Sequence, residues 1–186
     1  MRKFALPLLA LGTATLAACG GNDTAEEPAV ADTSMGAAGA GESAMATLTT
    51  ADGEEVGTVT ATGSAGGITV DVSAMNMPEG LHGVHIHTVG SCDDAFAAAG
   101  GHWNPDDAMH GLEGDDGQHA GDMPNLEIGA DGTGSLTYML SMSATFAGLM
   151  DEDGSAFIVH AGEDDQTTDP SGDSGDRIAC GVFTAG

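Results

Sequence analysis

The chain has 186 residues, with 29 Asp and Glu against only 3 Lys and Arg, and a formal net charge of −26 when histidine is neutral. This length suits one domain with additional material at one end. So acidic a chain is excluded from binding nucleic acid or anionic lipid through its own surface, and most of its acids are interpreted as solvated groups that favour solubility.

The first eighteen residues have the pattern of an export signal. Two basic residues are followed by an apolar stretch from Phe4 to Leu16 and then by small residues before Cys19. The stretch is too short for a membrane-spanning helix. A cysteine directly after small residues resembles a bacterial lipobox, which implies cleavage before Cys19 and a lipid on its sulfur. The alternative is an ordinary signal with an incidental cysteine.

We therefore predict a signal peptide over 1–18 and an exported protein, periplasmic or at the cell surface, that is anchored through lipidated Cys19. From Gly20 to about Met45 the chain is Ala, Gly, Ser, Thr and acid with almost no large apolar side chains. Such a segment buries too little surface to offset the entropy of ordering. Residues 19–45 are predicted to be a flexible acidic tether with a reach of roughly 30 Å, and residues 46–186 a single domain.

Short strand-like segments follow one another from residue 46 onward. They are rich in Thr, Val and Ile or alternate in polarity, and Gly, Asp or Pro bound them. One or two helical turns are expected only over 95–99 and 141–150. We predict an all-β domain, a Greek-key β-sandwich or flattened barrel, with two long functional loops over about 90–125 and 162–176. The predicted strands are 46–50, 56–62, 68–73, 83–88, 134–140, 156–160 and 178–183.

Histidines are distributed unevenly along the chain. Six lie between His82 and His119, and the seventh is His160. Imidazole is a common ligand for zinc and copper. His85 and His87 are two residues apart, so on an extended strand both rings point to the same face.

The loop that follows this strand carries further metal-binding side chains. His102, His110, His119 and Asp122 lie in a run rich in Gly, Pro and Asp that shows no apolar periodicity. A loop of this length is costly to order unless something fixes it. A metal bound by three histidines and one carboxylate would do so.

The cysteines form an even pair once Cys19 is set aside as the lipid site. In an exported protein, Cys92 and Cys180 are expected to form a disulfide that closes a loop of nearly ninety residues. Two buried thiols, or a separate metal site, are the alternatives.

A set of motifs in order along the chain resembles copper/zinc superoxide dismutase. They are G-V-H-I-H, G-G-H-W-N-P, His110, H-A-G-D, I-V-H-A-G-E-D-D and G-D-R-I-A-C-G-V, and the similarity runs from about residue 46 to 186. The resemblance implies that His85, His87 and His160 bind copper, that His102 bridges copper and zinc, and that His110, His119 and Asp122 complete the zinc site. Copper and zinc would be the cofactors and superoxide anion the substrate.

The resemblance also implies roles for residues around the metals. His82 would donate hydrogen bonds to backbone near the copper strand. Asp164 would link a copper histidine to a zinc histidine, with Asp165 as the alternative. Arg177 would orient the anionic substrate at the copper opening, because a guanidinium presents a fixed fork of donors; an arginine that only bonds loop carbonyls is the structural alternative.

The implied reaction is the disproportionation of superoxide, with His102 as a catalytic residue that carries a proton. The chain departs from its relatives before Arg177, where the loop is acidic or neutral and carries no lysine. An alternative function is a membrane-tethered protein that holds copper and zinc without turnover, and monomer and homodimer both stay open.

Overall fold

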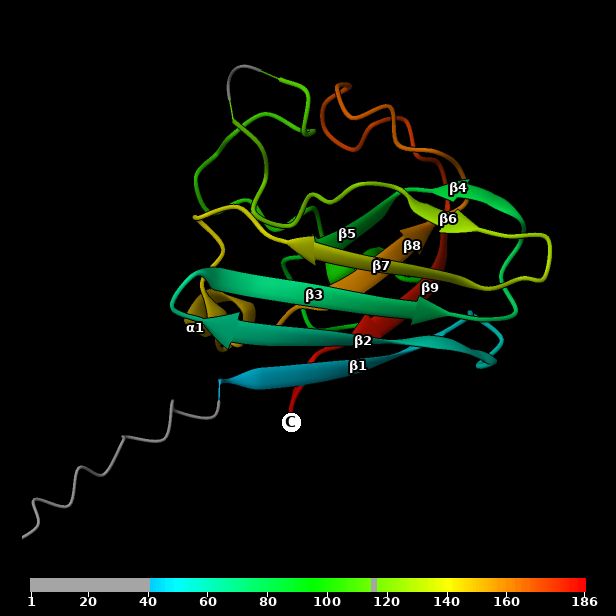
Figure 1. The fold of residues 1–186 in the computed structure, drawn as a ribbon, viewed down its shortest axis with the longest axis horizontal. Coiled ribbons are helices and arrows are strands. Elements are labelled where there is room, and N and C mark those ends of the chain that lie inside the picture. Colours follow the sequence, from blue (N-terminus) through cyan, green and yellow to red (C-terminus); the bar gives the residue numbers. More distant parts are fainter. Residues whose placement is uncertain (1–40, 115–116) are drawn as a thin grey trace, which may run out of the picture. The chain divides into compact units, whose positions relative to one another are not determined.

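The computed structural model describes residues 41–114 and 117–186, and within them the chain is almost entirely strand and loop (Figure 1). The predicted signal peptide over 1–18, the lipid site at Cys19 and the tether as far as residue 40 lie outside the described residues. No helix in these two described ranges is long and apolar enough to cross a membrane.

Eight strands form one curled antiparallel sheet in the order β5-β8-β9-β1-β2-β3-β7, with β10 paired to β1. A second, small sheet pairs β4 with β6. The all-β prediction is therefore confirmed. The strands are β1 Ser43–Thr49, β2 Glu55–Ser64, β3 Gly67–Ala74, β4 Gly80–His82, β5 Val84–His87, β6 Leu126–Ile128, β7 Gly134–Met139, β8 Ala156–His160, β9 Arg177–Val182 and β10 Thr184–Ala185.

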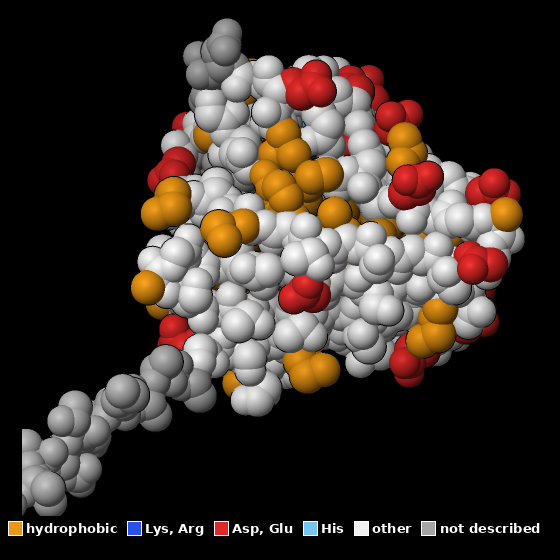
Figure 2. Space-filling model, in the orientation of Figure 1, with side chains coloured by type: hydrophobic (Ala, Val, Ile, Leu, Met, Phe, Trp, Pro, Cys, Tyr) orange, Lys and Arg blue, Asp and Glu red, His pale blue; other side chains and the backbone are white. Residues whose placement is uncertain are grey.

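The sheet curls so that β1, β2, β3 and β7 form one layer and β5, β8 and β9 lie behind it (Figure 1). Alternating residues of β2 and β3, such as Val59 and Val70, are buried between the layers with Ile86 and Phe157. Because successive side chains of a strand point to opposite faces, threonines such as Thr58 are left outside. On the face in Figure 2, acidic patches are scattered among neutral side chains.

The predicted strands differ from the observed ones mainly at their ends. β1 begins at Ser43, three residues before the predicted start, because Ala44 pairs with Ala61 of β2 and is fully buried. Because Ser43 and Ala44 are small, the sequence does not indicate that this part of the strand is buried. The strands β4, β6 and β10 were not predicted, since two or three residues are too few to show an alternating pattern.

The predicted helical positions each contain one short turn. A 3₁₀ turn covers Ala97–Ala99, and a four-residue helix, α1, covers Phe146–Leu149. Thr145 caps α1, because its side chain accepts a hydrogen bond from the backbone N–H of Gly148. Two long irregular segments, between β5 and β6 and between β8 and β9, contain the predicted functional loops.

The disulfide between Cys92 and Cys180 is present, with Cα atoms 5.8 Å apart across 88 residues of sequence. It ties the start of the first long loop to β9, close to Arg177. Closing a loop of this length restricts the unfolded chain, which stabilises the fold by on the order of 4–5 kcal/mol in the chain-entropy description.

Candidate metal centre

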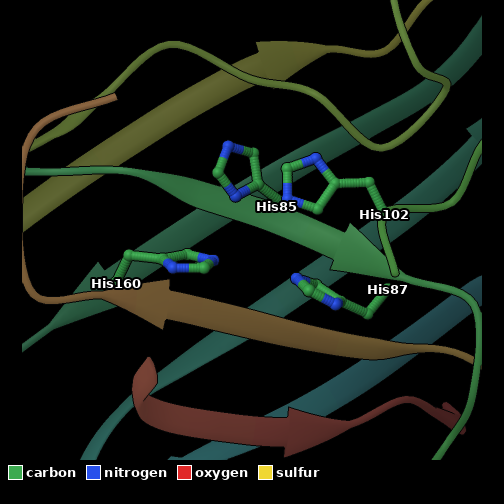
Figure 3. Close-up of side chains that lie close together, drawn as sticks. All are labelled: His85, His87, His102 and His160. Carbon is green, nitrogen blue, oxygen red and sulfur yellow. The ribbon is translucent and has the colours of Figure 1, made fainter. Parts of the chain in front are cut away.

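The edge strand β5 carries the two histidines that the sequence placed on one face. His85 and His87 are both buried, and β5 pairs with β8, which ends at His160. All three rings turn into the same space from two neighbouring strands (Figure 3). A stiff pair of strands therefore fixes their geometry without any contribution from the loops.

The first long loop is fastened to the free edge of β5 at two points. Trp103 N–H donates to the carbonyl of Ile86 at 2.8 Å, and Ile86 N–H donates to the carbonyl of Gly121 at 3.0 Å. Gly121 N–H in turn donates to Trp103 O. A side chain at Gly121 would meet Ile86 O at 2.3 Å, so only glycine permits this approach. The pairing delivers His102 and Asp122, the neighbours of these residues, to the same face.

Four buried ring nitrogens converge beside β5 without hydrogen-bond partners. They belong to His85, His87, His102 and His160, and ligand atoms of these four residues lie within 4.8 Å of one another (Figure 3). The unpartnered atoms are His85 Nδ1 and the Nε2 atoms of the other three. Buried polar atoms are rarely left unsatisfied, so four together indicate a missing partner. A copper ion fits them, because imidazole nitrogens suit copper in both of its common oxidation states.

The opposite nitrogen of three of these rings donates to a fixed acceptor. His87 Nδ1–H donates to Gly100 O and His160 Nδ1–H to Gly175 O, both at 3.0 Å, and His85 Nε2–H donates to Asp164 at 2.6 Å. Such acceptors fix the tautomer and the ring orientation of metal-binding histidines. The free nitrogen of each ring is therefore the one that faces the shared space.

Burial keeps these rings neutral. It lowers the pKa of His85 to about 3, that of His87 to about 2 and that of His160 to about 4, and it also lowers the pKa of His102. Nitrogens without protons are ready to bind a metal at neutral pH.

A second set of ligand atoms converges on Asp122, which is fully buried. Its Oδ1 lies 3.0 Å from His102 Nδ1 and 3.2 Å from His119 Nδ1, and its Oδ2 lies 3.2 Å from His110 Nδ1. The Nδ1 atoms of His102 and His119 are 3.4 Å apart. A tetrahedral zinc with bonds of about 2.0–2.2 Å separates its ligands by similar distances. These residues therefore fit zinc.

His85 also lies close to this second set, within 4.8 Å of His102, His110 and Asp122. Its Nε2, however, is already bonded to Asp164 and its Nδ1 belongs to the first set. His119 therefore completes the second set. His102 belongs to both, with Nδ1 facing Asp122 and Nε2 facing the copper-binding nitrogens.

Asp164 connects the two sets. Its carboxylate accepts hydrogen bonds from His85 Nε2–H and from His110 Nε2–H at 3.0 Å, and it is buried, whereas Asp165 is exposed and bonds Thr168. Although burial raises the pKa of Asp164, the hydrogen bonds from His110 and His85 lower it below its usual range. The charged carboxylate thus holds one ring of each set.

The same carboxylates change the titration of His110. Burial lowers its pKa, but hydrogen bonds to Asp122 and Asp164 outweigh burial and raise the pKa to about 9. The two carboxylates thus favour the form of His110 with a proton on each ring nitrogen, and zinc bound at Nδ1 would replace the proton there.

His82 and Asn125 support the centre through backbone. His82 Nδ1 lies 2.8 Å from His160 O and its Nε2 lies 2.9 Å from Pro78 O, as expected for a structural donor. Asn125 pairs with both backbone groups of Asp164, at 2.8 and 2.9 Å. Asn125 was not predicted, because a single asparagine before a short strand carries no signal of a partner 39 residues away.

Arg177 lies at the opening above the copper-binding nitrogens. Its guanidinium donates to Phe96 O and, at 2.6 Å, to Gly100 O. It lines a cavity of about 240 Å³ together with His87, His102 and His160. Both predicted roles, bonding to loop carbonyls and facing an anionic substrate, are therefore compatible in one position.

The fold and this site define a class: an all-β protein with two adjacent metal sites, one of nitrogen ligands alone and one closed by a carboxylate. The chain belongs to the copper/zinc superoxide dismutase family, whose profile matches residues 55–183. Copper and zinc are accordingly its cofactors.

Three relatives show the extent of the similarity. The chain is 43% identical over 123 residues to a superoxide dismutase-like protein of Bacillus subtilis, a match that spans 63% of each chain. It is 37% identical to a copper/zinc superoxide dismutase of Aquifex aeolicus, over 70% of this chain and 80% of that one. The solved copper/zinc superoxide dismutase of Brucella abortus is 34% identical, with a TM-score of 0.64 over 77% of this chain and 100% of that one.

Replacing Asp164 should weaken both metal sites. In Asp164→Asn one amide faces two rings that each need an acceptor, so we expect zinc and copper affinities to fall by roughly 10- to 100-fold. Asp165→Asn is the matched control, since that exposed carboxylate contacts neither set. Competition with a chelator, followed by metal analysis, measures the effect. Equal metal affinities in the two variants would contradict the linking role of Asp164.

Proposed function

We propose that the protein disproportionates superoxide: two superoxide anions and two protons give one dioxygen and one hydrogen peroxide. The observation that carries the proposal is the full set of four convergent, unpartnered imidazole nitrogens beneath an opening lined by Arg177. The chain is then an oxidoreductase of its family. Copper, when bound, supplies the alternating one-electron reduction and oxidation.

His102 is proposed to bridge the two metals and to carry a proton. Its ring stacks on His85 with centroids 3.9 Å apart, and its Nδ1 is held on the Asp122 side. Nε2 faces the copper-binding nitrogens and lines the cavity that holds Arg177. A proton held at Nε2 is therefore within reach of reduced substrate, while the Asp122 side keeps the ring in place.

Arg177 is proposed to bind and orient superoxide. Two of its nitrogens are occupied by carbonyls of the first loop, which fixes the plane of the guanidinium at the opening. Among the described residues it is the only Lys or Arg, so the attraction for an anion is short-ranged. The disulfide joins Cys92 in the first loop to Cys180, three residues after Arg177. It therefore links the loop that provides the carbonyls to the strand that carries the arginine.

Storage or transfer of metal without turnover is the competing function. The Bacillus relative bears on it, because its name says only that the protein is superoxide dismutase-like. A storage protein needs neither an arginine at the opening nor a ring shared between two sites. Both features support turnover.

We also propose export and lipidation at Cys19, on the pattern of the first eighteen residues, and action outside the cytoplasm. Analytical ultracentrifugation distinguishes the two oligomeric states that the sequence leaves open, a monomer and a homodimer.

Removing the shared ring should abolish most activity and disturb both metals. We expect His102→Ala, loaded with copper and zinc, to lose at least about two orders of magnitude in turnover, because it lacks a ligand to each ion and the proton carrier. Asp165→Asn, which alters an exposed carboxylate outside both ligand sets, is the control. Turnover is measured by pulse radiolysis and metal content by elemental analysis. Wild-type turnover in His102→Ala would refute the bridge.

Salt should reveal how superoxide reaches the site. The overall negative charge repels the substrate, and a Debye length near 8 Å at physiological ionic strength already screens distant charges. We therefore expect kcat/KM to rise or stay flat as salt is added to a dilute buffer, and to rise more steeply in Arg177→Ala. A steep fall with salt in the unmodified protein would show that local attraction at the opening dominates.

Cys19 should decide where the protein is found. We expect the unmodified chain, expressed in a bacterium with lipoprotein processing, to sediment with membranes, and Cys19→Ala to be exported in soluble form. Fractionation, with mass analysis of the processed N-terminus, checks both. Membrane association of Cys19→Ala chains that have lost the signal peptide would contradict the lipid anchor.

A further inference from the structure

A left-handed turn lies directly before the loop carbonyls that bind Arg177. Asp94, Ala95 and Phe96 are three successive residues with positive φ, of 53°, 49° and 71°. Only glycine adopts this conformation at little cost, because the Cβ atom of any other residue approaches the following carbonyl oxygen. Aspartate tolerates it better than most residues, whereas a bulky residue such as Phe96 rarely adopts it. Three such residues in a row therefore store strain in the backbone.

The buried ring of Phe96 holds this turn in place. Its exposed fraction is 4%, and it packs in a small apolar cluster beside the disulfide, with Ala99, Ile158 and Cys180. Ala95, in contrast, is exposed. Strained backbone persists only where the surroundings enforce it, and it is concentrated at ligand-binding sites and switch regions. Burial of the Phe96 ring supplies that enforcement here.

The turn sets the direction of the Phe96 carbonyl. This oxygen accepts a hydrogen bond from Arg177 Nη1–H and another, at 3.3 Å, from the backbone N–H of Ala99. The φ angle of Phe96 decides where both its ring and its carbonyl lie relative to the preceding chain. A negative φ would therefore take the ring out of its cluster or turn the carbonyl away from Arg177.

A second carbonyl connects the guanidinium to a copper-binding residue. Gly100 O accepts hydrogen bonds from Arg177 Nη2–H at 2.6 Å and from His87 Nδ1–H at 3.0 Å. Gly100 has a φ of 76°, and a side chain there would meet Thr88 Oγ1 at 2.8 Å. The 3₁₀ turn Ala97–Ala99 joins this glycine to the left-handed turn. The two carbonyls thus belong to one short unit with a positive φ at each end.

The two carbonyls are the main constraint on the guanidinium. Arg177 is half-buried and borders two cavities, one of about 240 Å³ beside the copper-binding nitrogens and one of about 570 Å³ on the outer side. The outer cavity is also lined by Ala95, Ala97, Gly175 and Asp176. Because open space borders this side chain in both places, packing alone does not fix its orientation.

We propose that the left-handed turn over Asp94–Phe96 is the element that positions Arg177 for anion binding. The buried ring holds the turn, the turn presents the Phe96 carbonyl, and this carbonyl with Gly100 O sets the plane of the guanidinium. Ala95 and Phe96 are therefore positioning residues, since they act through Arg177. This inference rests on the proposed role of Arg177 and adds the local structure on which that role depends.

Rotation of the Arg177 guanidinium tests the turn directly. Arginine labelled with ¹⁵N is incorporated into the full chain, which is loaded with zinc and copper(I) for NMR, and Arg177→Lys identifies the Arg177 signals. Two fixed hydrogen bonds oppose rotation about the Cζ–Nη bonds, so the two Nη groups should give separate signals. In Phe96→Ala, which removes the apolar anchor, and in Ala95→Val, we expect this rotation to be at least about tenfold faster. A β-branched side chain disfavours the left-handed conformation.

Azide, a small anion, measures the consequence for binding. It is titrated into the full chain loaded with zinc and copper(II), and absorption reports its binding to copper. We expect azide affinity per bound copper to fall roughly threefold to tenfold in Phe96→Ala and in Ala95→Val, because one charge-assisted interaction is misplaced. Phe96→Leu keeps an apolar side chain in the cluster and should restore most of the affinity.

Ala97→Val is the matched control for Ala95→Val. Ala97 is also exposed and lines the same cavity, but it begins the 3₁₀ turn and has no positive φ. This variant should keep the slow rotation and the azide affinity of the unmodified protein. Ala95→Val removes no buried contact, so it tests the turn even where Phe96→Ala does not fold.

Two results would overturn the positioning role. Slow rotation and unchanged azide affinity in Ala95→Val, with or without a loss of thermal stability, would make the turn a purely structural element. Equal effects of Ala95→Val and Ala97→Val would assign the change to crowding of the outer cavity. Neither measurement needs turnover. An unmodified, metal-loaded protein that fails to consume superoxide would refute the proposed function, whereas the rotation and azide results would still decide the role of the turn.

Discussion

The pairing of two loop segments with the edge of β5 is the constraint on which the metal centre depends. His102 and Asp122 are 20 residues apart, yet the backbone bonds of Ile86 to Trp103 and Gly121 place them beside His85 and His87. An exposed strand edge offers unpaired N–H and C=O groups. Here the loop takes up these groups, and the strand in turn orders a loop that has no secondary structure of its own.

Asp122 and Asp164 have different roles in the metal centre. Asp122 faces the ligand atoms of three histidines directly, whereas Asp164 holds the far nitrogens of one ring from each set. Both carboxylates stay ionised despite their burial, because hydrogen bonds from imidazole and backbone favour the charged form. The two metal sites are therefore coupled electrostatically and mechanically through buried acids.

The acidic composition has opposite consequences for metal cations and for superoxide. A negative chain attracts metal cations and repels superoxide, and the one Lys or Arg among the described residues, Arg177, lines the cavity beside His87, His102 and His160, where we propose that it binds the substrate. Carbonyls of the first loop hold Arg177 in place, and the disulfide fastens that loop to the strand of Arg177, so the same covalent link that stabilises the fold also helps to position the arginine.

Much of the metal centre could be predicted from the sequence, because the patterns that indicate it are local. Residue type and distance along the chain are enough to recognise three features: the spacing of His85 and His87 on a strand, the run that contains His102 to Asp122, and the even pair Cys92 and Cys180. The alternating patterns likewise gave the long strands. The two- and three-residue strands were missed, since pairing with a distant partner, not local pattern, makes them strands.

By itself the sequence determined the kinds of ligand present and the all-β class of the domain. Only the tertiary structure decided which nitrogen of each ring is free, that Asp164 and not Asp165 joins the two sets, and that Asn125 holds the backbone of Asp164. These features depend on hydrogen bonds between residues 13 to 79 positions apart. Such contacts exist only after the sheet has curled and the loops have closed over it, so no local pattern encodes them.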